Sequence, residues 1–200
     1  MTELEAVNYL LDAIGATGVN SLTLGHPAVD SARIRLEQAT RRVQQKGLWF
    51  NKDYNVTLSP EAVTKRILLQ DVRSVQTNNR VWVQRGKYLY NRLAQTYQFE
   101  EDVCIPILIR YITFEDMPDI AQDVAVYQAA AEFVGHELGD PNKVQAERQL
   151  EAGAKIELHA EHLRNEQFNV FDNPRIRRAR SGVRPYGSHA RDRFYGTPDR

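Results

Sequence analysis

The sequence predicts an α+β fold: an α-helical bundle, an antiparallel β subdomain inserted into it, and an extended basic arm at the C-terminus. Apolar residues recur at helical spacing in residues 3–46 and again from 118 onward, with two helices in each part, and they alternate in short strand-like runs between these parts. The period changes from 3.6 to 2 across Gly47, a residue able to take the left-handed conformation that ends helices. The predicted boundaries are 1–47 and 115–168 for the bundle, 48–114 for the β subdomain and 169–200 for the arm.

The two N-terminal helices are predicted by end signals and apolar stripes. Thr2 and Glu5 have the spacing of a capping box, which satisfies two free amide groups at a helix start, and Gly15 ends the first helix. Pro27 suits the first turn of the second helix, whose apolar side repeats at the steps of a helix packed on other helices. The exposed side of the second helix carries Arg33, Arg35, Arg41, Arg42 and Lys46.

The middle segment is predicted to contain a β-hairpin. Two alternating segments flank Arg85 and Gly86, which have the character of a two-residue turn. In that register Val83 lies opposite Tyr88, a favourable cross-strand pair.

The strongest strand prediction covers residues 103–112, which are apolar on both faces. Pro106 cannot donate to a strand ladder, so we expect either an edge strand or a bulge there. Cys104, the single cysteine, excludes an internal disulfide and favours a reducing compartment. A thiol within an apolar strand behaves as a small hydrophobe, so we do not expect it to be a nucleophile.

Two C-terminal helices follow. Pro118 opens the first, and acidic residues lie near its positive end. Gly139 ends it, and Asp140 with Pro141 opens a last helix that runs to about residue 167. This last helix is highly charged and only weakly amphipathic, so one side of it should face water. Its apolar stripe consists of Leu150, Ala154, Ile156, Ala160 and Leu163.

The formal net charge is zero, but the charge is unevenly distributed. Residues 174–200 hold eight arginines against two aspartates, a net charge of +6, so the remaining residues carry −6. Such arms bind nucleic-acid phosphates or order on acidic protein surfaces. Protein docking is favoured because the acidic remainder of the chain repels DNA. The candidate docking residues are Arg175, Arg177, Arg178, Arg180, Arg184, Tyr186, Arg191, Arg193, Phe194 and Tyr195.

A search for reactive groups yields no catalytic constellation, cofactor loop or metal site. His159 and His162 are three residues apart on a predicted helix, but no third ligand has suitable spacing. No glycine-rich phosphate loop is present. No apolar run approaches the roughly 20 residues of a membrane span, and the N-terminus lacks a signal-peptide pattern. We therefore expect no enzyme activity, no cofactor and no membrane partner.

Several motifs in order resemble the tail tubular protein A family of short-tailed bacteriophages. Each motif alone is weak, but their shared order and compatible spacing from about residue 4 to 170 are fairly specific. The resemblance ends before the arginine-rich arm. The matching segments are 6–8, 14–15, 19–22, 47–51 (Gly-Leu-Trp-Phe-Asn), 56–58, 81–90 and 114–118 (Phe-Glu-Asp-Met-Pro).

This resemblance implies a fold and a role in the virion. Family members combine a helical bundle with a β subdomain and act as the head-to-tail adaptor, or gatekeeper. They assemble as a dodecameric ring between the portal protein and the tail nozzle protein, tail tubular protein B, with tail fibres attached around the junction. Double-stranded DNA passes through the lumen during ejection without sequence-specific binding. The chain would then be made in the host cytoplasm and used in the virion.

Three expectations follow for particular residues. A channel for DNA should lack cationic walls, because phosphate contacts would hold the DNA. We therefore expect an acidic or neutral lumen, with Arg33, Arg35, Arg41 and Arg42 at subunit contacts or on the outer face. The arm should dock on the portal or on a neighbouring subunit. Gly47, Trp49 and Phe50 should close the structural junction between the bundle and the β subdomain.

Two alternatives remain open on the sequence alone. The first alternative to the adaptor is a nucleic-acid-binding module that uses the arginine-rich arm. The second is a head-completion connector of a long-tailed phage. Salt-sensitive DNA binding by the monomer favours the first alternative, whereas concentration-dependent ring formation favours the adaptor.

Overall fold

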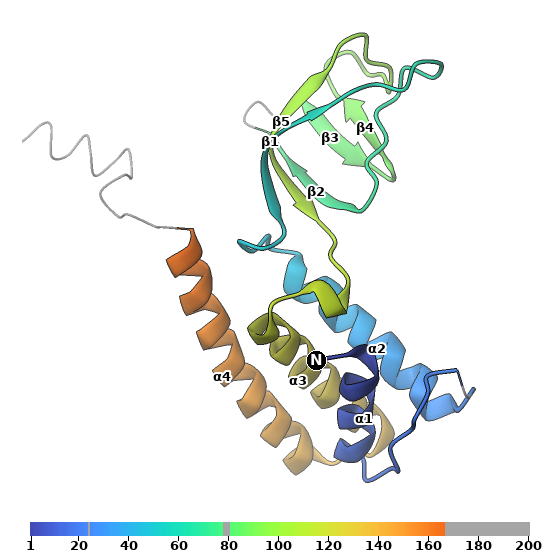
Figure 1. Cartoon of the computed structure of the whole chain (residues 1–200), viewed down its shortest axis with the longest axis vertical. Helices are drawn as coiled ribbons and strands as arrows, with labels where there is room; N and C mark the ends of the chain where they lie inside the picture. The colour runs from blue at the N-terminus through green and yellow to red at the C-terminus, as the bar shows by residue number, and fades with distance from the viewer. Residues whose placement is uncertain (24, 78–80, 167–200) are drawn as a thin grey trace, which may run out of the picture. The chain divides into compact units, whose positions relative to one another are not determined.

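The computed structural model of the chain describes residues 1–23, 25–77 and 81–166. Residues Met1–His162 form one compact unit, and a second unit begins at Leu163. The α+β prediction is confirmed, because two N-terminal and two C-terminal helices enclose an antiparallel β subdomain in the sequence (Figure 1). The helices are α1 (Glu3–Ala13), α2 (Pro27–Gln44), the 3₁₀ helix η1 (Phe114–Asp116), α3 (Asp119–Glu137) and α4 (Pro141–Asn165). The strands are β1 (Lys52–Leu58), β2 (Val72–Gln76), β3 (Trp82–Arg85), β4 (Tyr88–Asn91) and β5 (Val103–Arg110).

The predicted helix ends are present in the structure. The Thr2 hydroxyl accepts from the Glu5 amide at 3.2 Å, and the Glu5 carboxylate accepts from the Thr2 amide at 2.8 Å, which completes the capping box of α1. Pro27 is the first residue of α2, and His26 before it caps the helix through its ring nitrogen. Gly15 and Gly139 take left-handed conformations after α1 and α3.

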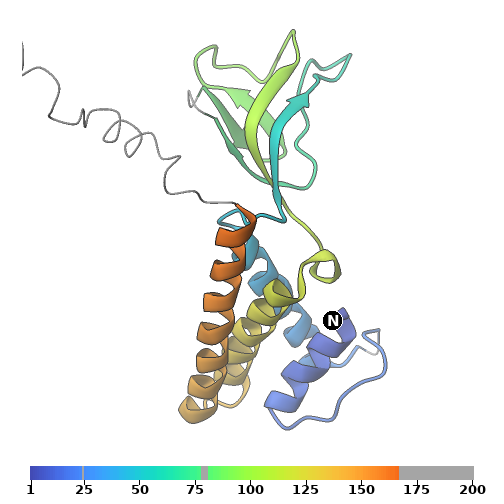
Figure 2. The same ribbon diagram turned by 60° about the vertical axis from the view of Figure 1, so that its left-hand side comes forward.

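The helical core is built from the apolar sides of α1, α2 and α3. Phe133 of α3 is completely buried at its centre, among leucines, valines and alanines of all three helices. Leu48 and Met117 extend this core toward the β subdomain. The helix α4 turns back along α3 (Figure 2) and contributes one buried side chain, Leu158. Burial of this apolar area is the main force that holds the bundle together.

The β subdomain contains a three-stranded antiparallel sheet in the order β1-β5-β2 and the two-stranded hairpin β3-β4. Ile67, Leu69, Leu89, Ile105 and Leu108 form the centre of its separate core. This core is distinct from the helical one, and the boundary between the two parts is described below.

The edge alternative for the strand around Pro106 is wrong, since β5 is the central strand of its sheet. The bulge alternative is also wrong at this position, since the pairing of β1 with β5 keeps one register on both sides of Pro106. The ladder only skips one pair there. The pairing of β1 with β5 omits Asn55, opposite Pro106, and Asn55 has a φ of +52°. On the other side β2 ends at Gln76, opposite Ile107, so no residue of β2 pairs with the proline. Cys104 lies in the strand as predicted, but it pairs with Thr57 and is exposed, so it is not the small hydrophobe of an apolar strand that the sequence led us to expect.

The predicted hairpin register is wrong by two residues. Gly86 and Lys87 form the turn, so Arg85 lies opposite Tyr88 and Val83 opposite Tyr90. Gly86 has a φ of +62° at the first central position, where a two-residue turn of type II′ requires glycine. The physical requirement at Gly86 therefore sets the register, and it excludes Arg85 from the turn.

Candidate assembly surfaces

Two buried amide side chains connect the backbone segments that pass between the bundle and the β subdomain. The Gln44 amide donates to the Ile112 carbonyl at 2.7 Å, and its oxygen accepts from the Ile112 amide at 2.8 Å. The Asn51 amide donates to the carbonyls of Gln44 and Arg110 at 3.1 and 3.0 Å, and its oxygen accepts from the Leu48 amide at 2.6 Å. Both side chains are almost fully buried, so these bonds form in a low-dielectric environment that strengthens them.

Sequence reasoning named Gly47, Trp49 and Phe50 at this junction. Gly47 has a φ of +71°, and a Cβ atom there would lie 2.7 Å from Cδ1 of Ile109, so glycine is required for two reasons. Trp49 packs edge-to-face on Phe50, with ring centroids 5.3 Å apart, and stacks on His162 at 6.2 Å. The structure thus brings the three residues together, but the two amides that bond across the junction were missed.

The sequence does contain a pattern that predicts burial of the Gln44 side chain. It follows Leu36 by eight residues and Thr40 by four, which places it on the buried side of α2, where a polar side chain needs a partner. Nothing in the local sequence, however, identifies Ile112 as that partner.

Three of the four predicted contact arginines of α2 form ion pairs within the chain. Arg33 contacts Glu3 of α1 at 3.0 Å, Arg41 contacts Glu37 one turn earlier, and Arg42 contacts Glu132 of α3. The three guanidinium side chains remain about half exposed. Arg35 has no ion pair with any described residue. Because exposed pairs contribute little to stability, these arginines remain available for contacts with another molecule.

A groove of about 610 Å³ runs along α2 between that helix, the start of α1 and the segment that precedes α3. Leu36, Thr40, Tyr111 and Phe114 are among its lining side chains, and Ile34 stands at it with 54% of its surface exposed. Thr40 is 1% exposed, and its hydroxyl has no hydrogen-bond partner in the described chain. The rim of the groove is charged and consists of Glu3, Asp30, Arg33 and Glu37.

The helix α4 has a second, outward side. The predicted stripe is divided: Ala154 packs on the helical core, whereas Ile156 and Leu163 lie on the outward side, and Leu150, one turn before Ala154, is 48% exposed. The side chain that is buried is Leu158, which the predicted stripe did not include. Ile156 is 71% exposed, an unusual position for a large aliphatic side chain in a described helix.

A polar contact between α1 and α4 has perturbed acid–base properties. The Tyr9 hydroxyl donates to the Glu147 carboxylate at 3.2 Å, and Tyr9 also packs edge-to-face on Tyr127. Burial raises the pKa of Tyr9, with the Glu147 charge adding to the effect. Burial also raises the pKa of Glu147, which the Tyr9 hydrogen bond partly opposes, and burial together with Asp119 raises the pKa of Asp123. This region is therefore a partly desolvated contact of α4.

The hairpin side of the β subdomain carries an arginine–tyrosine face. The Arg66 guanidinium lies 5.6 and 5.8 Å from the ring centroids of Tyr88 and Tyr97, and the Arg85 guanidinium lies 3.7 Å from that of Tyr90. Tyr90 and Tyr97 pack edge-to-face at 4.8 Å. Neither arginine pairs with a described carboxylate. Tyrosine and arginine are, with tryptophan, the residues enriched at the energetic centres of protein interfaces.

The predicted arm residues, Arg175 to Tyr195, lie outside the described residues. Within the part of the chain that is described, no three histidine, cysteine or acidic side chains are placed to hold a metal ion. His159 and His162 lie 6.4 Å apart as ring centroids, and the latter stacks on Trp49. None of the described helices has the length and apolar content that a bilayer crossing needs.

Comparisons with known proteins match most of the chain. A family model described as tail tubular protein matches residues 4–168, which include both the bundle and the β subdomain. The tail tubular protein A of Klebsiella phage KP34 is 30% identical over 189 residues, an alignment that covers 90% of this chain and 98% of the relative.

Proposed function

The chain belongs to the tail tubular protein A family, and on that basis we propose that it is the head-to-tail adaptor of its phage. Membership makes it a structural component of the bacteriophage virion tail rather than an enzyme. In the proposal, copies of the chain form a ring, of twelve subunits, beneath the portal protein and above the nozzle protein. Double-stranded DNA passes through the lumen, and tail fibres attach around the ring.

The observation that carries the proposal is the family match across residues 4–168, because it includes the helices, the β subdomain and their junction together. The surfaces of the chain agree with such a role. They offer apolar and arginine–tyrosine areas for protein contacts. Assembly proteins of this kind work through interfaces, which are rich in tyrosine and arginine.

We assign separate roles to the parts of the chain. Residues 1–47 and 115–168 form the subunit contacts of the ring, with Arg33 and Arg41 beside the α2 groove. Residues 48–114 present the arginine–tyrosine face to another virion protein, the nozzle or a fibre. Residues 169–200 dock on the portal or on a neighbouring subunit through their basic charge. The lumen is lined by acidic or neutral side chains.

Electron microscopy of the purified full chain, alone and mixed with portal rings, tests the proposal. The expected result is a ring that stacks on the portal in a fixed orientation. A protein that stays monomeric at all concentrations and binds DNA with strong salt dependence would instead support the nucleic-acid-binding alternative. Truncation before residue 174 tests the arm, since ring formation and portal binding that are both unchanged would exclude its proposed role.

A further inference from the structure

We propose that the outward side of α4 in one subunit packs into the α2 groove of the next subunit. This contact deepens the adaptor proposal and rests on it, because it names the surfaces through which the ring closes. It also commits the groove to one occupant, a second copy of the same chain.

The first argument is the composition of the outward side of α4. Its residues recur at steps of four, three, four and four, so they form one continuous line along the helix, and none is charged. Leu158, which packs on the helical core, lies on nearly the opposite side from Ile156. The line consists of Gln145, Gln149, Ala152, Ile156 and Ala160.

The second argument is that α4 has little packing within its own chain. It has 25 residues, of which only Leu158 is buried. Most helical stability in proteins comes from packing of an apolar face, and a helix in water gains little from propensity alone. An uncharged outward line containing an isoleucine at 71% exposure is therefore suited to a second packing partner.

The third argument is the complementary surface on α2. Ile34 is 54% exposed at the groove, whose lining includes Leu36, Tyr111 and Phe114. An exposed isoleucine in a groove with this lining offers an apolar surface to a packing partner. The small residues of the α4 line, Ala152 and Ala160, permit close approach of another helix.

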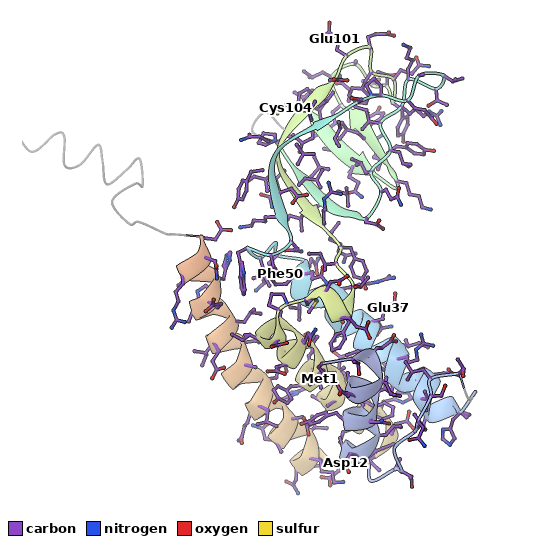
Figure 3. All side chains as sticks on the ribbon, in the orientation of Figure 1. Met1, Asp12, Glu37, Phe50, Glu101 and Cys104 are labelled. Atoms are coloured by element: carbon purple, nitrogen blue, oxygen red, sulfur yellow. The ribbon has the colours of Figure 1, made fainter. Side chains whose placement is uncertain are left out.

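The fourth argument is placement. Figure 3 shows Glu37, at the groove, on the side of α2 that is turned away from α4. A chain therefore cannot fill its own groove with its own α4. Two different surfaces of one protein form a head-to-tail contact, and repetition of such a contact by rotation closes a ring.

The C-terminal ends of α2 and α4 both lie at the junction between the bundle and the β subdomain. This shared end fixes the positions of residues on the two helices relative to each other along the helix direction. The helix α2 ends at Gln44, which bonds to Asn51, and His162 of α4 stacks on Trp49. Ile156 precedes His162 by about 9 Å of helix rise, and Glu37 precedes Gln44 by about 10.5 Å. In a ring whose axis runs along these helices, the neighbour's Ile156 is therefore level with Glu37.

Cysteine cross-linking in the assembled full chain tests this contact. In a Cys104→Ser background, Ile156→Cys chains are mixed with Glu37→Cys chains under oxidising conditions or with a short bismaleimide. The expected product is a dimer that needs both variants, and a chain with both cysteines should give a ladder of higher oligomers. Rings that form normally but give no such product, or that link Ile156→Cys to itself, would overturn the α4–α2 contact and leave the adaptor proposal intact. Absence of rings in the parent protein would overturn both.

A charge substitution gives an independent test. Ile156→Lys should abolish rings while leaving the helical content and melting temperature of the monomer within a few degrees of the parent. Val63→Lys is the matched control, since Val63 is 90% exposed in the β subdomain, and it should assemble normally. Normal ring formation by Ile156→Lys would contradict the inference.

Discussion

The helices α3 and α4 follow each other directly in the chain, yet they are held in opposite ways. The 19 residues of α3 include ten buried side chains, whereas the 25 residues of α4 include one. Within a subunit, α3 is therefore fixed by its own core, and α4 depends on a few contacts such as the Tyr9–Glu147 hydrogen bond. The difference indicates that one helix serves the fold and the other serves assembly.

The largest expected effect distinguishes the two helices. Phe133→Ala in α3 removes a fully buried ring and should lower the free energy of unfolding by about 3–5 kcal/mol. Ile156→Ala in α4 should change it by less than about 0.5 kcal/mol, because the side chain is mostly exposed. Urea denaturation of both variants at a concentration where the parent is monomeric measures the difference. Equal losses would show that α4 belongs to the same core as α3.

A second comparison concerns the junction that both helices support. Gln44→Leu leaves the amide and carbonyl of Ile112 without their side-chain partner, and it should destabilise the chain by about 2–4 kcal/mol. Thr40→Val, one turn earlier on the same helix, removes a hydroxyl that has no partner and should be neutral or slightly stabilising in the monomer. Thermal unfolding of the two variants side by side is the measurement. A loss in Thr40→Val as large as in Gln44→Leu would show that helix position rather than hydrogen bonding matters.

A third comparison separates strain from steric overlap at the junction. Gly47→Ala places a Cβ atom in contact with Ile109 in addition to forcing a left-handed backbone, and should cost about 2–3 kcal/mol. Gly15→Ala has a similar φ of +76° with open space around it, and should cost about 1 kcal/mol. Chemical denaturation of both variants gives the difference, which measures the overlap. Identical losses would mean that Ile109 moves aside freely.

The smallest effect is expected at the contact that holds α4. Because burial raises the folded-state pKa of Glu147, this group stabilises the chain most below its unfolded pKa of about 4.5, and the contribution is lost as the pH rises through the folded-state pKa. Glu147→Gln keeps an acceptor for the Tyr9 hydroxyl and removes the charge. It should be as stable as the parent or slightly more stable at pH 7, by well under about 1 kcal/mol because the site is partly exposed.

The pH profile of the melting temperature between pH 4.5 and 7 checks this expectation. The parent should lose more stability than Glu147→Gln over that range, and Tyr9→Phe, which removes the donor, should lose stability at both ends. A parent that becomes more stable with rising pH relative to Glu147→Gln would mean that the carboxylate is favourably paired rather than desolvated.

The sequence predicted the helices well because their ends have recognisable capping and terminating residues. The capping box at Thr2, the proline at the start of α2 and the glycines after α1 and α3 each satisfy a local requirement that is readable without tertiary structure. The predicted hairpin register was wrong because it placed glycine at the second position of the two-residue turn, whereas a type II′ turn requires glycine at the first position, which makes Gly86 and Lys87 the turn.

The candidate surfaces were less predictable than the fold. The predicted apolar stripe of α4 mixed residues from two sides of the helix. A helix with apolar residues on two sides has no single amphipathic direction. Periodicity therefore cannot distinguish the side that packs on its own subunit from the side that faces outward. The bonding roles of Gln44 and Asn51 were not predicted, because their hydrogen-bond partners Ile112 and Arg110 lie some 60 residues away in the sequence. Long-range hydrogen bonds of this kind leave no local pattern.

Hydrogen exchange of the full chain, measured as monomer and as assembled ring, tests the central claim most directly. In the monomer, amides of α3 should be strongly protected and those of α4 weakly protected, because protection follows local stability. On assembly, protection of α4 from about residue 145 to 160 and of α2 around Ile34 should rise, while that of α3 stays the same. A ring in which α4 exchanges as fast as in the monomer would contradict the account.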